Sequence, residues 1–159
     1  METPSLPDLP NRRRPVHQPV FEQQNRSNIV FVTVCTENRR PLLANAQLHR
    51  AITTAWSKAT HWLVGRYVIM PDHVHLFCAP ATLPPEPLRS WVSFWKRFVT
   101  QTHGTRLWQK NFWDTQLRAH ESYAAKWNYV RENPVRAGLV TKTEDWAFQG
   151  ELNPLRWHE

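Results

Sequence analysis

The amino-acid sequence predicts a single α+β domain, because strand-like and helix-like segments alternate along its 159 residues. A chain of this length is expected to bury one hydrophobic core rather than two. Residues 67–77 are rich in β-branched and aromatic side chains and are interrupted by Pro71 and Asp72, which predicts two strands joined by a turn. Residues 88–102 instead place an apolar stripe at helical spacing, made of Leu88, Trp91, Val92, Trp95, Phe98 and Val99.

The remaining elements follow from the same two periodicities. Residues 28–36 are expected to form the first strand and residues 47–62 the first helix. Strands over residues 63–70 and 73–79, the helix over residues 88–102 and a short strand over residues 112–118 come next. A last helix begins near residue 122 and is expected to end near Asn133, because a residue before proline is biased away from helical geometry.

The two ends of the chain differ from this middle part. Residues 1–27 combine five prolines with the run Arg12-Arg13-Arg14, which predicts a flexible, basic, proline-rich arm. Composition alone is as consistent with a solvated tail as with an arm that contacts DNA. Residues 141–159 are expected to form an ordered C-terminal extension, to which the sequence assigns no function.

The charge of the chain favours a polyanionic partner without identifying one. Twenty Lys and Arg against thirteen Asp and Glu give a net charge of +7, and the isoelectric point is near 10.0. Several of the nine tryptophans are expected in the core, and a surplus would be suited to stacking on unpaired bases.

Several classes of protein are disfavoured by the sequence. With four glycines and no phosphate-binding loop, nucleotide hydrolysis is not expected. Cys35 and Cys78 both lie in predicted strands and are interpreted as buried, reduced thiols. No run has the length of a membrane span or the pattern of a secretory signal, so we expect a cytoplasmic protein that does not act at a membrane.

His73 and His75 are the most informative residues. Side chains on a strand alternate between faces, so the two imidazoles are expected on one face and Val74 on the other. Two adjacent imidazoles can hold a divalent metal ion. A pair of half-buried histidines with backbone partners is the alternative, and for an isolated His-x-His it would be the commoner case.

The last predicted helix carries two tyrosines in different positions. At about 100° per residue, Tyr123 falls in an apolar arc with Trp127 and Val130. Tyr129 falls on the polar side, and Asn133 lies one turn further on that side. Tyr123 is therefore expected to pack in the core and Tyr129 to be presented, although an ordinary surface tyrosine would show the same pattern.

Four motifs in order resemble REP-associated tyrosine transposases of the HUH single-tyrosine transposase superfamily, the IS200-like transposases. The two strongest are Met70-Pro71-Asp72-His73-Val74-His75-Leu76 and the segment of residues 129–140, which runs from Tyr129 to Val140. Residues 31–43 and residues 107–118 agree in order and spacing. The resemblance covers residues 28–140.

The resemblance implies a ferredoxin-like sandwich. Its antiparallel sheet carries the His-Val-His motif, with helices on one face and an added C-terminal tyrosine helix. It further implies a metal bound by His73, His75 and Asn133, and Tyr129 as the nucleophile. The reaction is then the cutting and rejoining of single-stranded DNA with REP-like hairpins, through a covalent 5′-phosphotyrosine. DNA transposition or repeat processing would follow, in the nucleoid, by a monomer or a homodimer.

The metal and the base remain open at this stage. Phosphoryl chemistry commonly uses Mg²⁺ or Mn²⁺, and two imidazoles with one amide oxygen suit Mn²⁺ somewhat better. Metal-bound solvent, Asp72, His120 or Asp114 are candidates to accept the tyrosine proton, and each of the three side chains is more commonly structural.

Two groups of basic residues are candidate DNA contacts. Arg12, Arg13 and Arg14 are carried over from the resemblance, because the N-terminal region of these transposases helps to recognise single-stranded DNA beside the hairpin. The second group, on the polar face of the helix over residues 88–102, consists of Arg89, Lys96 and Arg97. Contact with the DNA backbone competes there with ordinary solvated helix charge.

Two alternative functions are compatible with the sequence. The first is a protein of the same fold that binds DNA hairpins without catalysis, although complete motifs argue against this alternative. An unrelated metallohydrolase would use the histidine pair, but no further His, Asp or Glu ligand stands at a convincing spacing.

Overall fold

The chain forms a five-stranded antiparallel sheet with helices on both faces. Residues 28–158 are described by a computed structural model. The strands are β1 (Val30–Cys35), β2 (Trp62–Met70), β3 (His73–Pro80), β4 (Trp113–Gln116) and β5 (Gln149–Glu151). Their order across the sheet is β4-β1-β3-β2-β5. The first four strands have the order of a ferredoxin-like sandwich, so the predicted α+β fold class is confirmed.

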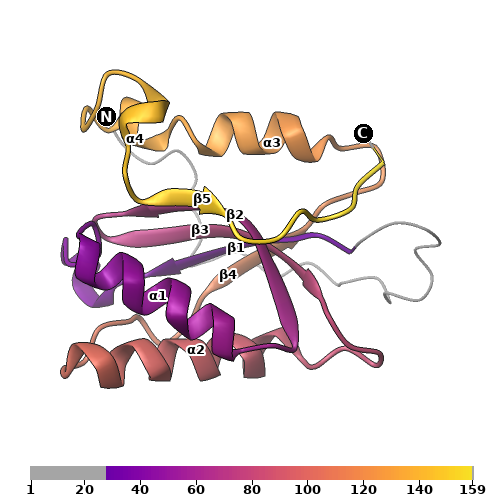
Figure 1. Cartoon of the computed structure of the whole chain (residues 1–159), viewed down its shortest axis with the longest axis horizontal. Coiled ribbons are helices and arrows are strands. Elements are labelled where there is room, and N and C mark those ends of the chain that lie inside the picture. The colour runs from indigo at the N-terminus through magenta and orange to yellow at the C-terminus, as the bar shows by residue number, and fades with distance from the viewer. Residues whose placement is uncertain (1–27, 159) are drawn as a thin grey trace.

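The helices divide between the two faces of the sheet (Figure 1). α1 (Ala46–Lys58) and α2 (Leu88–His103) cover one face, and α3 (Tyr123–Val130) lies across the other, followed by the short α4 (Asn133–Arg136). Two 3₁₀ turns, η3 (Glu37–Arg39) and η4 (Thr143–Asp145), lie in the connections. Within residues 28–158, no helix has both the length and the apolar character that crossing a membrane requires.

Local sequence signals fix where these helices begin and end. The side chain of Asn45 accepts a hydrogen bond from the Leu48 amide at the start of α1, and Ser122 accepts one from the Ala125 amide at the start of α3. Gly104, with φ of 97°, ends α2 in the left-handed conformation that glycine adopts at little cost.

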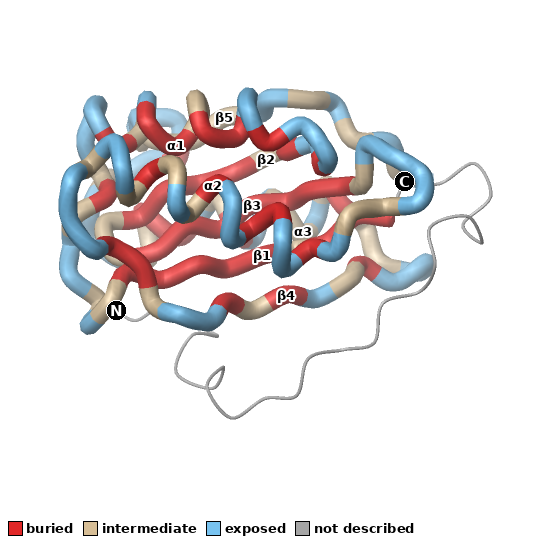
Figure 2. The backbone as a smooth tube through the Cα atoms, turned by 90° about the horizontal axis from the view of Figure 1, so that it is seen from below, coloured by how far each residue is buried: buried red, intermediate tan, exposed pale blue. Residues whose placement is uncertain are grey.

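Two hydrophobic cores lie on opposite faces of the sheet. The larger one packs α1 and α2 against the sheet and contains the fully buried Trp91 and Trp95. The buried strands run between the helices as a continuous layer (Figure 2). The smaller core packs α3 on the other face and contains Ile29, Val68, Met70, Phe77, Leu117, Tyr123 and Val130. This second core fixes α3 over the face that carries His73 and His75.

Three boundaries differ from the sequence prediction. The first helix ends at Lys58, and Trp62 starts β2. The predicted helix over residues 122–133 is two helices, because the chain bends after Val130 and Asn133 starts α4 with Pro134 in its first turn. Residues 149–151 of the predicted C-terminal extension form β5, which pairs with Arg66, Tyr67 and Val68 of β2.

Candidate active site

The β2–β3 hairpin places both histidines on the face covered by α3. In the register of β3 against β1, His73 lies opposite Cys35 and His75 opposite Thr33. The ring centroids of the two histidines are 4.6 Å apart, and both side chains are buried. Val74 belongs to the core on the other face. The predicted alternation of the two imidazoles against Val74 is therefore confirmed.

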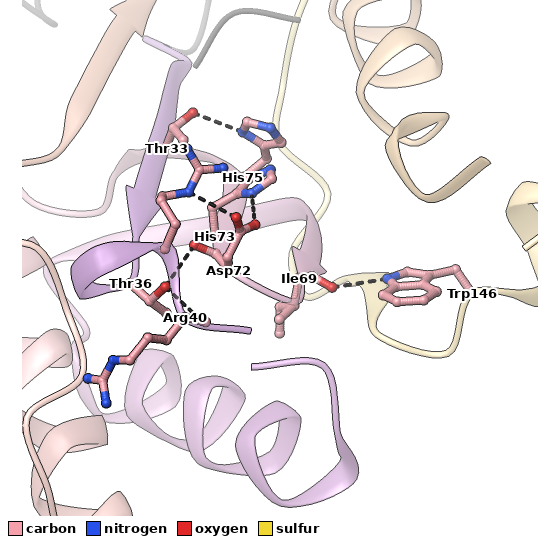
Figure 3. Close-up of polar contacts among 9 residues, drawn as sticks. Thr33, Thr36, Arg40, Ile69, Asp72, His73, His75 and Trp146 are labelled. Carbon is pink, nitrogen blue, oxygen red and sulfur yellow. Dashed lines mark hydrogen bonds and ion pairs between the residues drawn. The ribbon is translucent and has the colours of Figure 1, made fainter. Parts of the chain in front are cut away.

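Each histidine has one ring nitrogen held by a polar neighbour (Figure 3). Nδ1 of His73 is 2.8 Å from Oδ1 of Asp72, and Nδ1 of His75 is 2.8 Å from Oγ1 of Thr33. Nε2 of His73 is buried and has no hydrogen-bond partner within residues 28–158. An unpaired buried polar atom costs about 1–3 kcal/mol, so a ligand for this nitrogen would be stabilising. A carboxylate on Nδ1 with Nε2 left open is the usual arrangement of a metal-binding histidine.

The Asp72 carboxylate is itself held by Arg39. Nε of Arg39 donates to Oδ2 of Asp72 at 2.9 Å. Asn38 and Arg39 have φ of 58° and 53°, a left-handed backbone that is strained for residues other than glycine. The backbone amide of Thr36 also donates to the carbonyl oxygen of Asp72, at 3.0 Å. The strained turn thus holds Arg39, Asp72 and His73 in one chain of contacts.

Burial keeps both imidazoles neutral. It lowers the pKa of His73, although the hydrogen bond and charge of Asp72 act in the opposite direction. Burial also lowers the pKa of His75 well below its usual value, and the charges of His73, Arg136 and Arg39 add to this effect. A metal ion binds only the deprotonated imidazole nitrogen, so both residues are in the protonation state that a metal ligand needs near neutral pH.

The two tyrosines of α3 differ as the helical periodicity predicts. Tyr123 is 3% exposed and packs its ring 5.0 Å from that of Phe77, centroid to centroid. Tyr129 is 53% exposed. The contrast confirms that Tyr123 is packed and Tyr129 presented to solvent.

Asn133 is placed differently from the prediction. It does not continue the polar side of the tyrosine helix; it is buried at the start of α4. Its Nδ2 donates to the carbonyl oxygen of Val130 at 2.9 Å, which satisfies one of the open carbonyls at the end of α3. The amide orientation leaves Oδ1 as the atom available to a cation.

The donors present fit a divalent ion of the kind used in phosphoryl chemistry. No group of three or more His, Cys, Asp or Glu side chains able to hold a metal occurs in the described part of the chain. Two imidazoles and one amide oxygen would leave coordination positions for water or phosphate oxygens. The open Nε2 of His73 and its Asp72 partner are the observations that favour such an ion.

The three side chains that are candidates to accept the proton of Tyr129 lie in three different environments. Asp72 is engaged with His73 and Arg39. Asp114 lies opposite Val32 in the register of β4 against β1, which puts it on the face of α1 and α2, away from the histidines. His120 is exposed in the loop before α3. A base for Tyr129 is thus not assigned.

The candidate DNA contacts that lie among the described residues are away from this site. Arg12, Arg13 and Arg14 lie outside the described residues. Arg89, Lys96 and Arg97 are on α2, across the sheet from the histidines (Figure 1). Nζ of Lys96 donates to the carbonyl oxygens of Gln109 and Lys110, at 2.7 and 3.3 Å. Contact of these residues with DNA stays a prediction.

Two arginines of the site were not predicted. Arg39 lies beside His73 through Asp72, and Arg136 stacks on the Tyr129 ring, while its charge helps to lower the pKa of His75. Both belong to segments that carry the transposase resemblance, so the motifs themselves were the available signal. Their contacts depend on the turns at Asn38 and after Val130, which local periodicity does not reveal.

Comparison with known proteins finds transposases among the sequence relatives and the solved structures. No family model matches the chain. A REP-associated tyrosine transposase from Escherichia coli (strain K12) is 27% identical over 121 residues, covering 74% of this chain and 73% of that protein. A putative REP-associated tyrosine transposase from Haemophilus influenzae (strain ATCC 51907 / DSM 11121 / KW20 / Rd) is 26% identical over 110 residues, covering 56% of this chain and 62% of that protein.

A solved structure shows the same fold. A REP-associated tyrosine transposase bound to a REP hairpin matches with a TM-score of 0.72 and 24% identity, covering 87% of this chain and 81% of that one. The chain therefore shares the α+β fold of that protein. More narrowly, the resemblance to REP-associated tyrosine transposases that the motifs predict is confirmed by the sequence relatives and the shared fold.

Proposed function

We propose that this chain is a metal-dependent endonuclease and strand transferase for single-stranded DNA that forms hairpins. The observation that carries the proposal is the pair of buried imidazoles, one with an open Nε2, on the sheet face beneath the helix that presents Tyr129. The sequence relatives are transposases, which supports a DNA-processing reaction.

The residues of the hairpin and of α4 supply the metal site in this proposal. His73, His75 and Asn133 would hold Mg²⁺ or Mn²⁺, through the imidazole nitrogens that do not contact Asp72 and Thr33 and through the Asn133 amide oxygen. When bound, such an ion supplies Lewis-acid stabilisation of the charge that develops on the phosphate and the leaving oxygen. Asp72 and Thr33 orient the imidazoles through their Nδ1 atoms, and Arg39 keeps Asp72 in place.

Tyr129 is the nucleophile. Its Oη forms a bond to phosphorus, its proton passes to solvent, and the bond from phosphorus to the 3′ oxygen breaks in line. The DNA is left with a free 3′-hydroxyl on one side and a 5′-phosphotyrosine on the other. Because the ester is exchanged rather than hydrolysed, attack of a 3′-hydroxyl on the phosphotyrosine rejoins the strand without ATP.

A DNA hairpin is the proposed partner. The solved structure with the same fold is described as bound to a REP hairpin. The net charge of +7 supports a polyanionic ligand. REP-like repeats are the substrate class we propose, and movement or processing of DNA at such repeats follows from the reaction.

Labelled hairpins test this function. Single-stranded hairpins with 5′ or 3′ labels, drawn from repeats that flank the gene, are mixed with the protein in Mn²⁺, Mg²⁺ or EDTA. A metal-dependent covalent adduct at the 5′ phosphate of the downstream fragment, which retains a 3′ label, is expected; it should be absent in Tyr129→Phe and retained in the matched control Tyr123→Phe. Full cleavage by Tyr129→Phe would contradict the assignment. Tight hairpin binding with no adduct in any metal would replace the nuclease by a non-catalytic binding protein.

A further inference from the structure

Arg136 holds Tyr129 by two contacts. Its Cζ lies 4.2 Å from the centroid of the Tyr129 ring, within the range of a cation–π interaction. Its Nη2 donates to the carbonyl oxygen of Tyr129 at 2.9 Å, so the guanidinium also closes the C-terminal end of α3. These contacts use one face of the guanidinium and one of its outer nitrogens.

The same side chain retains a donor with no partner. Nε of Arg136 is buried and makes no hydrogen bond within residues 28–158. A guanidinium is permanently charged, so an open buried N–H favours an anionic oxygen as its acceptor. The charge of Arg136 also contributes to the lowered pKa of His75, so the guanidinium acts electrostatically on a candidate metal ligand as well as contacting Tyr129.

We propose that Arg136 binds the phosphate that Tyr129 attacks, with the ring contact and Nη2 fixing the guanidinium and Nε donating to a phosphate oxygen. This inference rests on the proposed function of Tyr129. Arg136 would then align the nucleophile and the phosphate with one rigid group, which is the geometric advantage of arginine over lysine.

A second arginine–tyrosine contact on α3 provides a matched control. Cζ of Arg66 lies 4.9 Å from the centroid of the Tyr123 ring at the other end of the helix. Nε of Arg66 is 3.4 Å from Oε2 of Glu151, so this guanidinium already has an anionic partner. Arg66→Gln removes an arginine that stacks on the other tyrosine of α3, without removing a donor from the site.

A charge-deletion series along the DNA tests the contact without relying on turnover. In a Tyr129→Phe background with Mn²⁺, hairpin strands are prepared with one phosphate of the single-stranded foot at a time replaced by a neutral methylphosphonate. Dissociation constants are measured by fluorescence anisotropy at one fixed salt concentration. Arg136→Gln and Arg66→Gln are each added to this background, and circular dichroism checks that every variant is folded.

We expect one linkage at which neutralisation weakens binding about tenfold when Arg136 is present and less than about twofold in Arg136→Gln. Arg66→Gln should retain the tenfold loss. The linkage should be the one at which the unmodified protein forms its adduct. If Arg136→Gln does not fold, Arg136→Lys replaces it, and a loss reduced to about threefold or less at that linkage supports the proposal.

Two results would overturn it. An equal loss with and without Arg136 at every linkage would show that Arg136 does not contact a phosphate. Coupling at a linkage other than the cleaved one would show that the contact is not with the phosphate that Tyr129 attacks. Failure of the nuclease assignment gives a different result, because the unmodified protein then forms no covalent adduct. If the effect of neutralising one phosphate still depends on Arg136, then Arg136 is a phosphate contact of a DNA-binding protein without nuclease activity.

Discussion

The two ends of α3 carry the same pair of residue types and differ in what surrounds them. At the N-terminal end Tyr123 is 3% exposed and lies under Arg66, whose guanidinium is paired with Glu151. At the C-terminal end Tyr129 is 53% exposed and lies under Arg136, whose Nε has no partner in the described residues. One end anchors the helix, and the other presents the tyrosine that we propose as the nucleophile.

The polar contacts explain this division. The Tyr123 hydroxyl accepts a hydrogen bond from the Arg66 amide at 3.1 Å, and burial raises the pKa of Tyr123 to about 12. An anchored, strongly protonated phenol is poorly suited to attack phosphorus. The arginine–tyrosine contact is common to both ends of the helix. The two tyrosines differ in burial and in the second partner of the arginine, and we infer that these two features determine which tyrosine is able to react.

The largest effect is expected from Tyr129→Phe. Removal of the nucleophilic oxygen should lower the rate of adduct formation by about 10³-fold or more. The exposed ring is retained, so the midpoint of thermal unfolding should change by no more than about 2 °C. Single-turnover gel assays and thermal circular dichroism measure the two quantities. A large fall in the unfolding midpoint would mean that Tyr129 is also an anchor.

Tyr123→Ala should have the opposite profile. Loss of a buried aromatic side chain removes about 3–5 kcal/mol from the free energy of unfolding, which corresponds to a fall of roughly 10 °C in the unfolding midpoint. Urea and thermal unfolding provide the measurement, with Tyr129→Ala as the exposed control. A stability within about 0.5 kcal/mol of the unmodified protein would contradict the anchoring role.

Asp72→Asn tests whether the reactive end is a metal site. Loss of the carboxylate that orients His73 should weaken Mn²⁺ binding about 10- to 100-fold. Calorimetric titration of the DNA-free protein with Mn²⁺ gives the affinity directly. The exposed Asp145→Asn serves as the control, with unchanged affinity expected. Equal Mn²⁺ affinities for the two variants would show that Asp72 does not contribute to metal binding.

The smallest effect concerns how the free energy of unfolding depends on pH in the alkaline range. The pKa of Tyr123 is raised to about 12 in the folded chain from 10.0 as the reference value. Below pH 10 its contribution to stability is complete. Between pH 10 and pH 12 the unfolded chain loses the proton first, so the contribution declines as pH rises. Urea unfolding from pH 9 to pH 12 measures the difference in the free energy of unfolding between the unmodified protein and Tyr123→Phe. This difference should become smaller as the pH rises. A difference that stays constant would contradict the raised pKa of Tyr123.

Local periodicity predicted most of the helices and strands, whereas the ferredoxin-like topology was implied by the resemblance to the transposases. The two-residue period placed His73 and His75 together, and the helical period separated Tyr123 from Tyr129. β5 was missed because Gln149, Gly150 and Glu151 have no apolar alternation, and the strand is defined by backbone pairing with β2. Trp146 supports the same edge by donating its Nε1 hydrogen bond to the Ile69 carbonyl, a contact across 77 positions of sequence (Figure 3).

The candidate site was predictable only where its residues lie within a motif. The histidines and Tyr129 could be named from their segments. The contact of Asp72 with Arg39 requires a left-handed turn at Asn38 and Arg39, and the contact of Arg136 with Tyr129 requires the bend between α3 and α4. Such contacts depend on where the chain turns back, so propensity and spacing do not reveal them.

Mapping of the DNA attachment point tests the central claim most directly. The covalent complex formed with a labelled hairpin in Mn²⁺ is digested, and tandem mass spectrometry locates the nucleotide among the three tyrosines of the chain. The account predicts modification of Tyr129 alone, through its phenolic oxygen. Modification of Tyr123 or Tyr67, or a covalent complex with no modified tyrosine, would contradict it.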